Sequence, residues 1–215
     1  MKCDILPYTM TTPSTQPSRI QKGTDILRAR LQEQGLWTVL VWIFNRGFSY
    51  LTGVPLLGRS RISNHVYVGP QFNRLGMRFL QREGISAVVN MRIEHDDADE
   101  GLLLDAYCYL PTVDDTAPSD EHIDEGVQFM RRMIAEGHKV YIHCAGGIGR
   151  APTMAAAYFM YEGDTLDEAL TRITRVRPYI RIMPPQMALL QRLEARQEPR
   201  MGQADAPEAV FQDHR

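Results

Sequence analysis

The sequence predicts an α/β domain with a central, mainly parallel β-sheet flanked by helices. From residue 62 onward, short apolar runs typical of buried strands alternate with stretches whose apolar residues recur at helical spacing. Turn residues separate these runs, and glycine directly follows several of the expected helices. A sheet built from strands that alternate with helices is mainly parallel and is covered on both faces.

The strands and helices can be placed from these patterns. The expected strands are ISNHVYVGP from residue 62, ISAVVNMR from 85, LDAYCYLP from 104 and KVYIH from 139. The expected helices are QFNRLGMRFLQREG from residue 71, a helix capped by Ser119 and stopped at Gly137, GRAPTMAAAYFMYEG from 149, a helix from Thr165 and PPQMALLQRLEA from 184.

The flanking segments differ in composition from this domain. We expect a disordered tail over residues 1–23, an apolar helical segment over 24–57, the α/β domain over 58–196 and a flexible tail over 197–215. The first twenty residues are polar and rich in Thr, Ser and Pro, which is not the pattern of a signal peptide.

The segment 36–57 begins with an apolar run from Leu36 to Phe44 in which only Thr38 is polar. A membrane span needs ~20 apolar residues, and Asn45 and Arg46 interrupt this run. Three interpretations stay open. The favoured one is a buried helix packed on the domain. The others are a helix on a membrane surface anchored by Trp37, Trp42 and Phe48, and a transmembrane helix.

Charge and cysteine content exclude some classes of protein. A formal net charge of −2 and a pI of about 6.3 give no global basic field for nucleic acid. The three cysteines are an odd number without paired spacing, which argues against a disulfide framework and for a reducing compartment. We therefore expect a cytoplasmic protein, with association at a membrane surface as the alternative.

The stretch VYIHCAGGIGRAPT, residues 140 to 153, has the features of a phosphate site: an apolar strand, a glycine-rich loop and a helix start. A phosphate ester carries about two negative charges and needs many donors at close range. The loop residues can turn successive backbone N–H groups inward, and the helix adds its own N–H groups. These substrate-binding residues are Ala145, Gly146, Gly147, Ile148 and Gly149.

Two side chains in this stretch carry the expected chemistry. The thiolate of Cys144, favoured by the surrounding donors, is a nucleophile without a separate base. Arg150 offers a planar fork that can bind two phosphate oxygens. His143 is expected to orient the loop and belongs with the substrate-binding residues, although a core histidine is the alternative.

The sequence His-Cys, five residues and Arg resembles the signature of the protein tyrosine phosphatase superfamily. The resemblance covers residues 62 to 193 and points to the dual-specificity branch, because no phosphotyrosine-pocket insertion is recognisable upstream. It implies the cysteine-phosphatase fold for residues 58–196 and hydrolysis through a phosphocysteine. It also implies chemistry that needs no cofactor and no metal.

The resemblance also indicates the general acid. In dual-specificity phosphatases this acid follows a strand that ends in Pro-x-x-Asp, and LPTVD places Asp114 at that position. Asp115 remains the alternative. General acid catalysis of this kind contributes ~10²–10⁴ in rate.

Other residues are weaker candidates. Residues 172 to 193 look like the region that such phosphatases place beside the active site, where Arg177, Arg181 and Gln186 could face substrate or position water. Each of them is more commonly structural. The acidic run EHDDADE at 94–100 is expected to be a solvated loop rather than a set of metal ligands.

The substrate is left open between classes. A dual-specificity protein tyrosine/serine/threonine phosphatase is the first expectation. Two runs, TVDDTAPSDEHIDEGVQFM from Thr112 and RPYIRIMPPQ from Arg177, are similar to phosphatidylglycerophosphate phosphatases. The loop sequence GIGRAP is similar to glucan phosphatases. Two departures from the family pattern, Ala151 after the arginine and Gly146, keep a low-activity phosphate-binding module as a further alternative.

Overall fold

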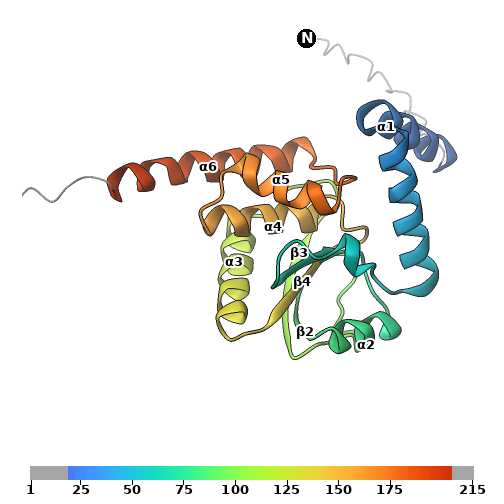
Figure 1. The fold of residues 1–215 in the computed structure, drawn as a ribbon, viewed down its shortest axis with the longest axis horizontal. Coiled ribbons are helices and arrows are strands. Elements are labelled where there is room, and N and C mark those ends of the chain that lie inside the picture. The colour runs from blue at the N-terminus through green and yellow to red at the C-terminus, as the bar shows by residue number, and fades with distance from the viewer. Residues whose placement is uncertain (1–18, 205–215) are drawn as a thin grey trace, which may run out of the picture. The chain divides into compact units, whose positions relative to one another are not determined.

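The computed structural model describes the backbone of residues 19–204 and the side chains of residues 35–196 (Figure 1). The chain divides between Val39 and Leu40 into two compact units. The tails expected at 1–23 and 197–215 lie largely outside the described residues, so both remain predictions. Helices are nevertheless present at Arg19 and as far as Ala204, inside the ranges assigned to the tails.

The second unit is built on a four-stranded sheet in the order β1-β4-β2-β3. The strands are Val66–Gly69 (β1), Ile85–Arg92 (β2), Ala106–Thr112 (β3) and Lys139–His143 (β4). All three pairings are parallel, which confirms the predicted sheet. The carboxyl ends of all four strands therefore meet at one edge, which we call the carboxyl edge.

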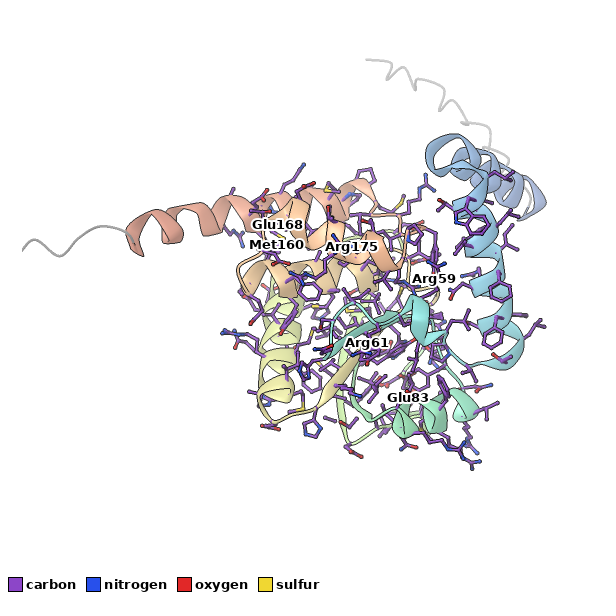
Figure 2. All side chains as sticks on the ribbon, in the orientation of Figure 1. Arg59, Arg61, Glu83, Met160, Glu168 and Arg175 are labelled. Atoms are coloured by element: carbon purple, nitrogen blue, oxygen red, sulfur yellow. The ribbon has the colours of Figure 1, made fainter. Side chains whose placement is uncertain are left out.

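Helices cover both faces of this sheet (Figure 1). One face carries Arg74–Arg82 (α2), and the other carries Asp120–Ala135 (α3), Arg150–Tyr161 (α4), Leu166–Val176 (α5) and Pro184–Ala204 (α6). Figure 2 shows the same separation: Glu83, after α2, lies on one side, and Met160 and Glu168 lie on the other.

Each strand contributes alternate side chains to the two cores. In β4, Val140 and Ile142 belong to the larger core with α3 to α6, whereas Tyr141 belongs to the core with Leu80 of α2. This alternation is the period of two expected of strands buried on both faces. The layers hold the end of β4, where the candidate nucleophile lies, between fixed neighbours.

The helices α3 and α5 begin where the sequence predicts, whereas α2 was expected from Gln71 and begins at Arg74, after its cap Asn73. The side chain of Ser119 accepts a hydrogen bond from the backbone of His122 at 3.1 Å and caps α3. Thr165 and Glu168 form a capping box at the start of α5. Such caps satisfy N–H groups of the first helical turn. Local signals of this kind made the helix starts predictable.

The helix α1 runs from Arg19 to Thr52 and is broken at Gly35, whose φ of 79° is non-helical. The part from Leu40 to Thr52 belongs to the second unit. On this part the polar Asn45 and Ser49 are buried, at 2% and 5% exposed, whereas Phe44 and Leu51 are 66% and 83% exposed. The apolar side of this helix therefore faces outward.

The segment 36–57 was expected to be apolar and helical, and α1 covers it as far as Thr52. Of its expected anchors, Trp37 is 74% exposed, whereas Trp42 and Phe48 are partly buried. Among the described residues, no helix has both the length and the apolar content needed to cross a bilayer.

Candidate active site

The loop that follows β4 lies at the carboxyl edge and runs from Cys144 to Gly149, where α4 begins. Gly147 has a φ of 64°, and a Cβ at this position would collide with the backbone of Gly69 at the end of β1. Only glycine combines this backbone conformation with so close an approach. The glycine-rich sequence is thus required by the turn itself.

Cys144 lies inside this loop and is 3% exposed. The backbone N–H of Gly147 donates a hydrogen bond to its Sγ at 3.3 Å. The first turn of α4 begins directly afterwards, without a side-chain cap on Gly149. The sulfur therefore sits beside unpaired helical N–H groups and the positive end of the helix dipole, which favour an anion.

Arg150 is 1% exposed and is fixed by bonds from three directions. Its Nη1 donates to the carbonyl oxygen of Thr112 at 2.8 Å. The same atom and Nη2 form a bidentate pair with Glu94, both at 2.9 Å. Its buried Nε has no hydrogen-bond partner among the described residues. A buried donor of this kind is suited to a phosphate oxygen.

Glu94 carries a full negative charge in this arrangement. The hydrogen bond from Arg150, with further contributions from Arg92, lowers the pKa of Glu94 to about 2 despite partial burial. Arg92 lies 2.9 Å from the same carboxylate. Glu94 thus holds the guanidinium of Arg150 in one orientation.

The candidate acid Asp114 follows β3 and reaches the same place. Its Oδ1 lies 3.0 Å from Nη2 of Arg150, and its side chain is 72% exposed. Asp115 is also exposed, and its φ of 61° belongs to the left-handed region. The structure therefore brings Asp114 to Arg150, whereas no ion pair or hydrogen bond of the Asp115 side chain is found among the described residues.

His143 is completely buried at the end of β4 and donates from Nε2 to Oδ2 of Asp97 at 2.8 Å. Gln71 donates to the other oxygen of Asp97 at 2.8 Å. Burial opposes the charge on Asp97, but the hydrogen bond and charge of His143 outweigh it, so the pKa of this carboxyl lies below its usual value. Asp97 thus fixes the orientation of the His143 ring, and His143 supports the adjacent Cys144 through the backbone.

These contacts correct the expectation of a solvated loop at residues 94–100. Asp97 is completely buried and Glu94 pairs with Arg150, so both belong to the support of the site. Sequence reasoning missed them because their partners lie about fifty positions away. One signal was available: the run directly follows β2, and side chains after parallel strands gather at the same edge. The described residues include no cluster of His, Cys, Asp and Glu suited to a metal ion.

Arg177 supports the loop from outside. It is completely buried, and its Nε and Nη2 donate to the carbonyl oxygen of Gly147 at 3.1 and 2.9 Å. The backbone N–H of Arg181 adds a bond to the carbonyl oxygen of Ile148 at 2.9 Å. Both residues therefore hold the loop by its carbonyl oxygens, Arg177 through its guanidinium and Arg181 through its backbone N–H.

Gln186 connects the loop to the segment that bears Asp114. It is completely buried, and its Nε2 donates to the carbonyl oxygen of Thr116 at 3.0 Å. A Cβ added to Gly149 would lie 3.2 Å from its Oε1. These contacts give Gln186 a positioning role between the two parts of the site.

Comparisons with known proteins agree with this geometry. A family model described as "Polymorphic toxin system, DSP-PTPase phosphatase" matches residues 66–164, a range that includes the loop. The human protein "Phosphatidylglycerophosphatase and protein-tyrosine phosphatase 1" (Homo sapiens) is 32% identical over 184 residues, which are 78% of this chain and 88% of that protein.

A second relative is much longer than this chain. "Protein phosphatase Slingshot homolog 3" from Rattus norvegicus is 29% identical over 136 residues, which are 61% of this chain. The chain spans only 20% of the length of that relative. The similarity therefore concerns a domain and not the whole of that protein.

Solved structures show the same fold. A crystal structure of PTPMT1 in complex with PI(5)P has a TM-score of 0.59 and 27% identity, and covers 66% of this chain and 97% of that one. The active form of Tk-PTP has a TM-score of 0.56 and 31% identity, and covers 64% of this chain and 96% of that one. The chain belongs to the dual-specificity branch of the protein tyrosine phosphatase superfamily, a family of cysteine-dependent phosphoric monoester hydrolases, as its sequence predicts.

Proposed function

We propose that the chain hydrolyses phosphate monoesters through a phosphocysteine formed on Cys144. The observation that carries this proposal is the convergence of Arg150 and Asp114, 3.0 Å apart, beside the loop that contains the buried sulfur. A nucleophile, an arginine with a free donor for phosphate and a proton donor are the groups that this reaction requires.

In the first step, the thiolate of Cys144 attacks phosphorus while the bond to the ester oxygen breaks. Asp114 gives its proton to that oxygen, which leaves as an alcohol. Arg150 and the loop N–H groups bind the three remaining oxygens, whose charge they stabilise in the transition state.

In the second step, water attacks the phosphocysteine. Asp114, now a carboxylate, takes a proton from the water, inorganic phosphate leaves, and the thiolate of Cys144 is restored. In most relatives, Ser or Thr directly after the arginine helps the sulfur to leave. Ala151 occupies that position here and is completely buried.

The missing hydroxyl makes the second step the slow one. We expect a burst of alcohol release from an aryl phosphate, equal to about one per active site, followed by a slower steady rate. Ala151→Ser is expected to raise that steady rate several-fold without changing the burst size. Stopped-flow absorbance measures both phases, and a wild-type trace without a burst would place the limit in the first step.

The first candidate substrate is a phosphoprotein, dephosphorylated at tyrosine, serine or threonine. A lipid phosphate is the second candidate. It is supported by the apolar side chains that α1 exposes beside the loop, including Phe44 at 66% and Leu51 at 83% exposed. We propose that this side of α1 lies on a membrane surface, where aromatic and aliphatic side chains enter the interface.

A substrate panel tests the proposed activity directly. Phosphopeptides, phosphatidylglycerophosphate in vesicles, a phosphoglucan and an aryl phosphate are compared on one purified sample. Turnover of none of them would leave a phosphate-binding module and remove the enzymatic proposal.

Cys108 and Cys144 are both free thiols, which fits the proposed cytoplasmic location and calls for reducing buffers.

The membrane contact has its own test. Replacing both Phe44 and Leu51 with serine is expected to reduce co-sedimentation with anionic lipid vesicles by on the order of tenfold, because two large apolar side chains no longer leave water. The control is Leu103→Ser, another exposed leucine, at 45% exposed, before β3. Equal sedimentation of all three proteins would remove the membrane contact.

A further inference from the structure

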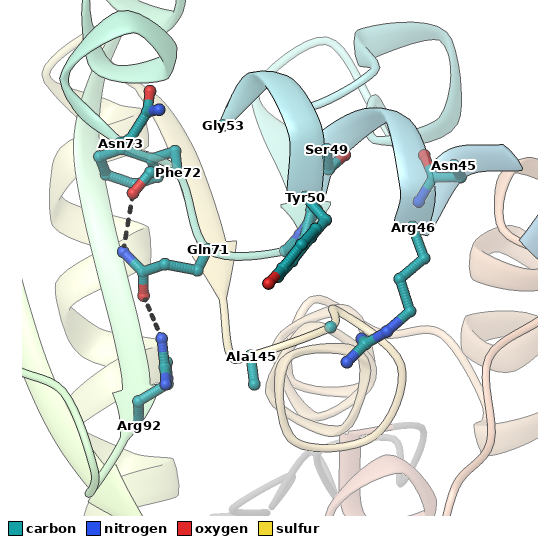
Figure 3. Close-up of a pocket in the computed structure, with 12 residues that line it drawn as sticks. Asn45, Arg46, Ser49, Tyr50, Gly53, Gln71, Phe72, Asn73, Arg92 and Ala145 are labelled. Atoms are coloured by element: carbon teal, nitrogen blue, oxygen red, sulfur yellow. Dashed lines mark hydrogen bonds between the residues drawn. The ribbon is translucent and has the colours of Figure 1, made fainter. Parts of the chain in front are cut away.

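A cavity of about 370 Å³ opens beside the catalytic loop (Figure 3). Its walls come from the part of α1 after Leu40, from the segment that follows β1, from Arg92, and from Ala145 and Gly146 of the loop. In Figure 3, Arg46 reaches from α1 toward the loop, and Arg92 lies on the other side of Ala145. The cavity therefore lies beside the loop that contains Cys144, with Ala145 and Gly146 in its wall.

The charged side chains that line this cavity are positive. None of the described residues that line it is acidic, and two are arginines. Arg92 already pairs with Glu94 at 2.9 Å and donates to Gln71 at 3.1 Å. Arg46 is exposed, and no ion-pair partner of it is found among the described side chains, so its guanidinium is available to an anion.

Gly146 lies directly opposite the guanidinium of Arg46. A Cβ at Gly146 would lie 2.8 Å from Nη1 of Arg46, so any other residue would displace the guanidinium. Gly146 stands where alanine is commoner in related loops. The approach of Arg46 explains this departure, since no positive φ requires glycine at this position.

The same wall of α1 contains polar atoms without partners. Asn45 and Ser49 are 2% and 5% exposed, and both line the cavity. Within the described part of the chain, Oδ1 of Asn45 and Oγ of Ser49 have no hydrogen-bond partner. Buried polar atoms are normally satisfied, and hydroxyl groups of a ligand in the cavity would satisfy both.

We propose that this cavity is a subsite for a second phosphate group, joined to the scissile phosphate through a hydroxyl-bearing carbon chain, and that Arg46 selects for it. The inference rests on the proposed phosphatase function and specifies its substrate. Arg46 binds the second phosphate, and Asn45 and Ser49 bind the hydroxyls between the two phosphates. The cavity volume is within the range of small-molecule sites.

A purely structural role explains these features less well. A cation near the end of a helix can stabilise its dipole, but α1 continues six residues beyond Arg46 to Thr52, and its last turn has no basic residue. The guanidinium of Arg46 instead lies directly against Gly146, so its charge is placed over the loop. The position of Arg46 over the loop is the feature that ligand binding accounts for.

Kinetics on paired substrates test the proposal in the full-length protein. Fructose 1,6-bisphosphate is compared with fructose 6-phosphate, and a short-chain phosphatidylglycerophosphate below its micellar concentration is compared with para-nitrophenyl phosphate. In each pair only the first substrate has a second phosphate. The measured quantity is the ratio of kcat/KM between the two members of a pair.

We expect Arg46→Gln to lower this ratio about tenfold, mainly through KM, because a charge-assisted bond to phosphate is lost. Gly146→Ala, which displaces the guanidinium, should lower it in the same direction. Arg46→Lys should restore part of it. The control Arg82→Gln, an exposed arginine at the end of α2 and thus at the opposite edge of the sheet, should keep the wild-type ratio.

The outcomes distinguish failure of the second-phosphate subsite from failure of the phosphatase function. A loss of ratio in both pairs supports a second-phosphate subsite open to soluble and lipid substrates, and a loss in the lipid pair alone assigns it to a lipid headgroup. A ratio within twofold of wild type in Arg46→Gln for both pairs overturns the subsite. Wild-type protein that turns over no substrate overturns the phosphatase function instead. Melting temperatures of all variants establish that each one is folded.

Discussion

Replacing Cys144 with serine is expected to abolish turnover of an aryl phosphate while leaving the binding of inorganic phosphate intact. An alcohol is a far weaker nucleophile than a thiolate in a site built to stabilise the thiolate. Removal of a catalytic nucleophile lowers kcat by on the order of 10⁶-fold in well-studied hydrolases. Binding should persist, because Arg150 and the loop N–H groups are unchanged.

Cys108→Ser is the matched control for this experiment. Cys108 lies within β3, and burial raises the pKa of its thiol to about 12, so it stays neutral and unreactive. This variant should turn over substrate like the wild type. Substantial activity in Cys144→Ser would remove the covalent mechanism, and loss of activity in both variants would point to a folding defect instead.

Asp114→Asn is expected to slow turnover by ~10²–10⁴ on substrates with poor leaving groups, because their oxygen must be protonated as it leaves. An aryl phosphate with a good leaving group should be affected much less. The measurement is kcat across a series of aryl phosphates with increasing leaving-group pKa. The slope of log kcat against that pKa should become steeper in the variant.

Asp115→Asn provides the comparison at the next position. Its left-handed backbone, with φ of 61°, is one that asparagine also adopts, so the turn should persist. We expect the wild-type slope for this variant. The steeper slope in Asp115→Asn and not in Asp114→Asn would move the general acid by one residue.

The fold was predictable because its signals are local. The strands are short apolar runs, and the helix starts are marked by Ser119 and by the pair Thr165 and Glu168, which cap as their spacing indicates. The turn between β4 and α4 was predictable for the same reason. Cys144, Gly147 and Arg150 lie within seven consecutive residues, and the loop geometry follows from their order.

The support of the site was not predictable, because its contacts join distant parts of the sequence. His143 and Asp97 are 46 positions apart, and Arg150 and Glu94 are 56 apart. An acidic run has the same composition whether water or buried cations surround it. The acidic run contacts the loop because β4 and β2 lie side by side in the sheet, so the residues that follow these two strands are close together.

The packing of the part of α1 after Leu40 was not predictable either. Asn45 and Arg46 break the apolar run, which excludes a simple membrane span but does not reveal what they face. They line the cavity beside Gly146. The direction of a helix face depends on the partner against which it packs, and the sequence pattern alone does not specify that partner.

The bonds from Arg177 to the carbonyl oxygen of Gly147 have a consequence for the motion of the catalytic loop. In a trans peptide the N–H points opposite to the carbonyl, so fixing this oxygen against Arg177 also fixes the direction of the N–H of Ile148. A peptide unit beside glycine can otherwise rotate between two opposite orientations with little steric resistance. The buried arginine suppresses that inversion, and the entropy of orienting the donor is lost once during folding instead of each time a phosphate binds.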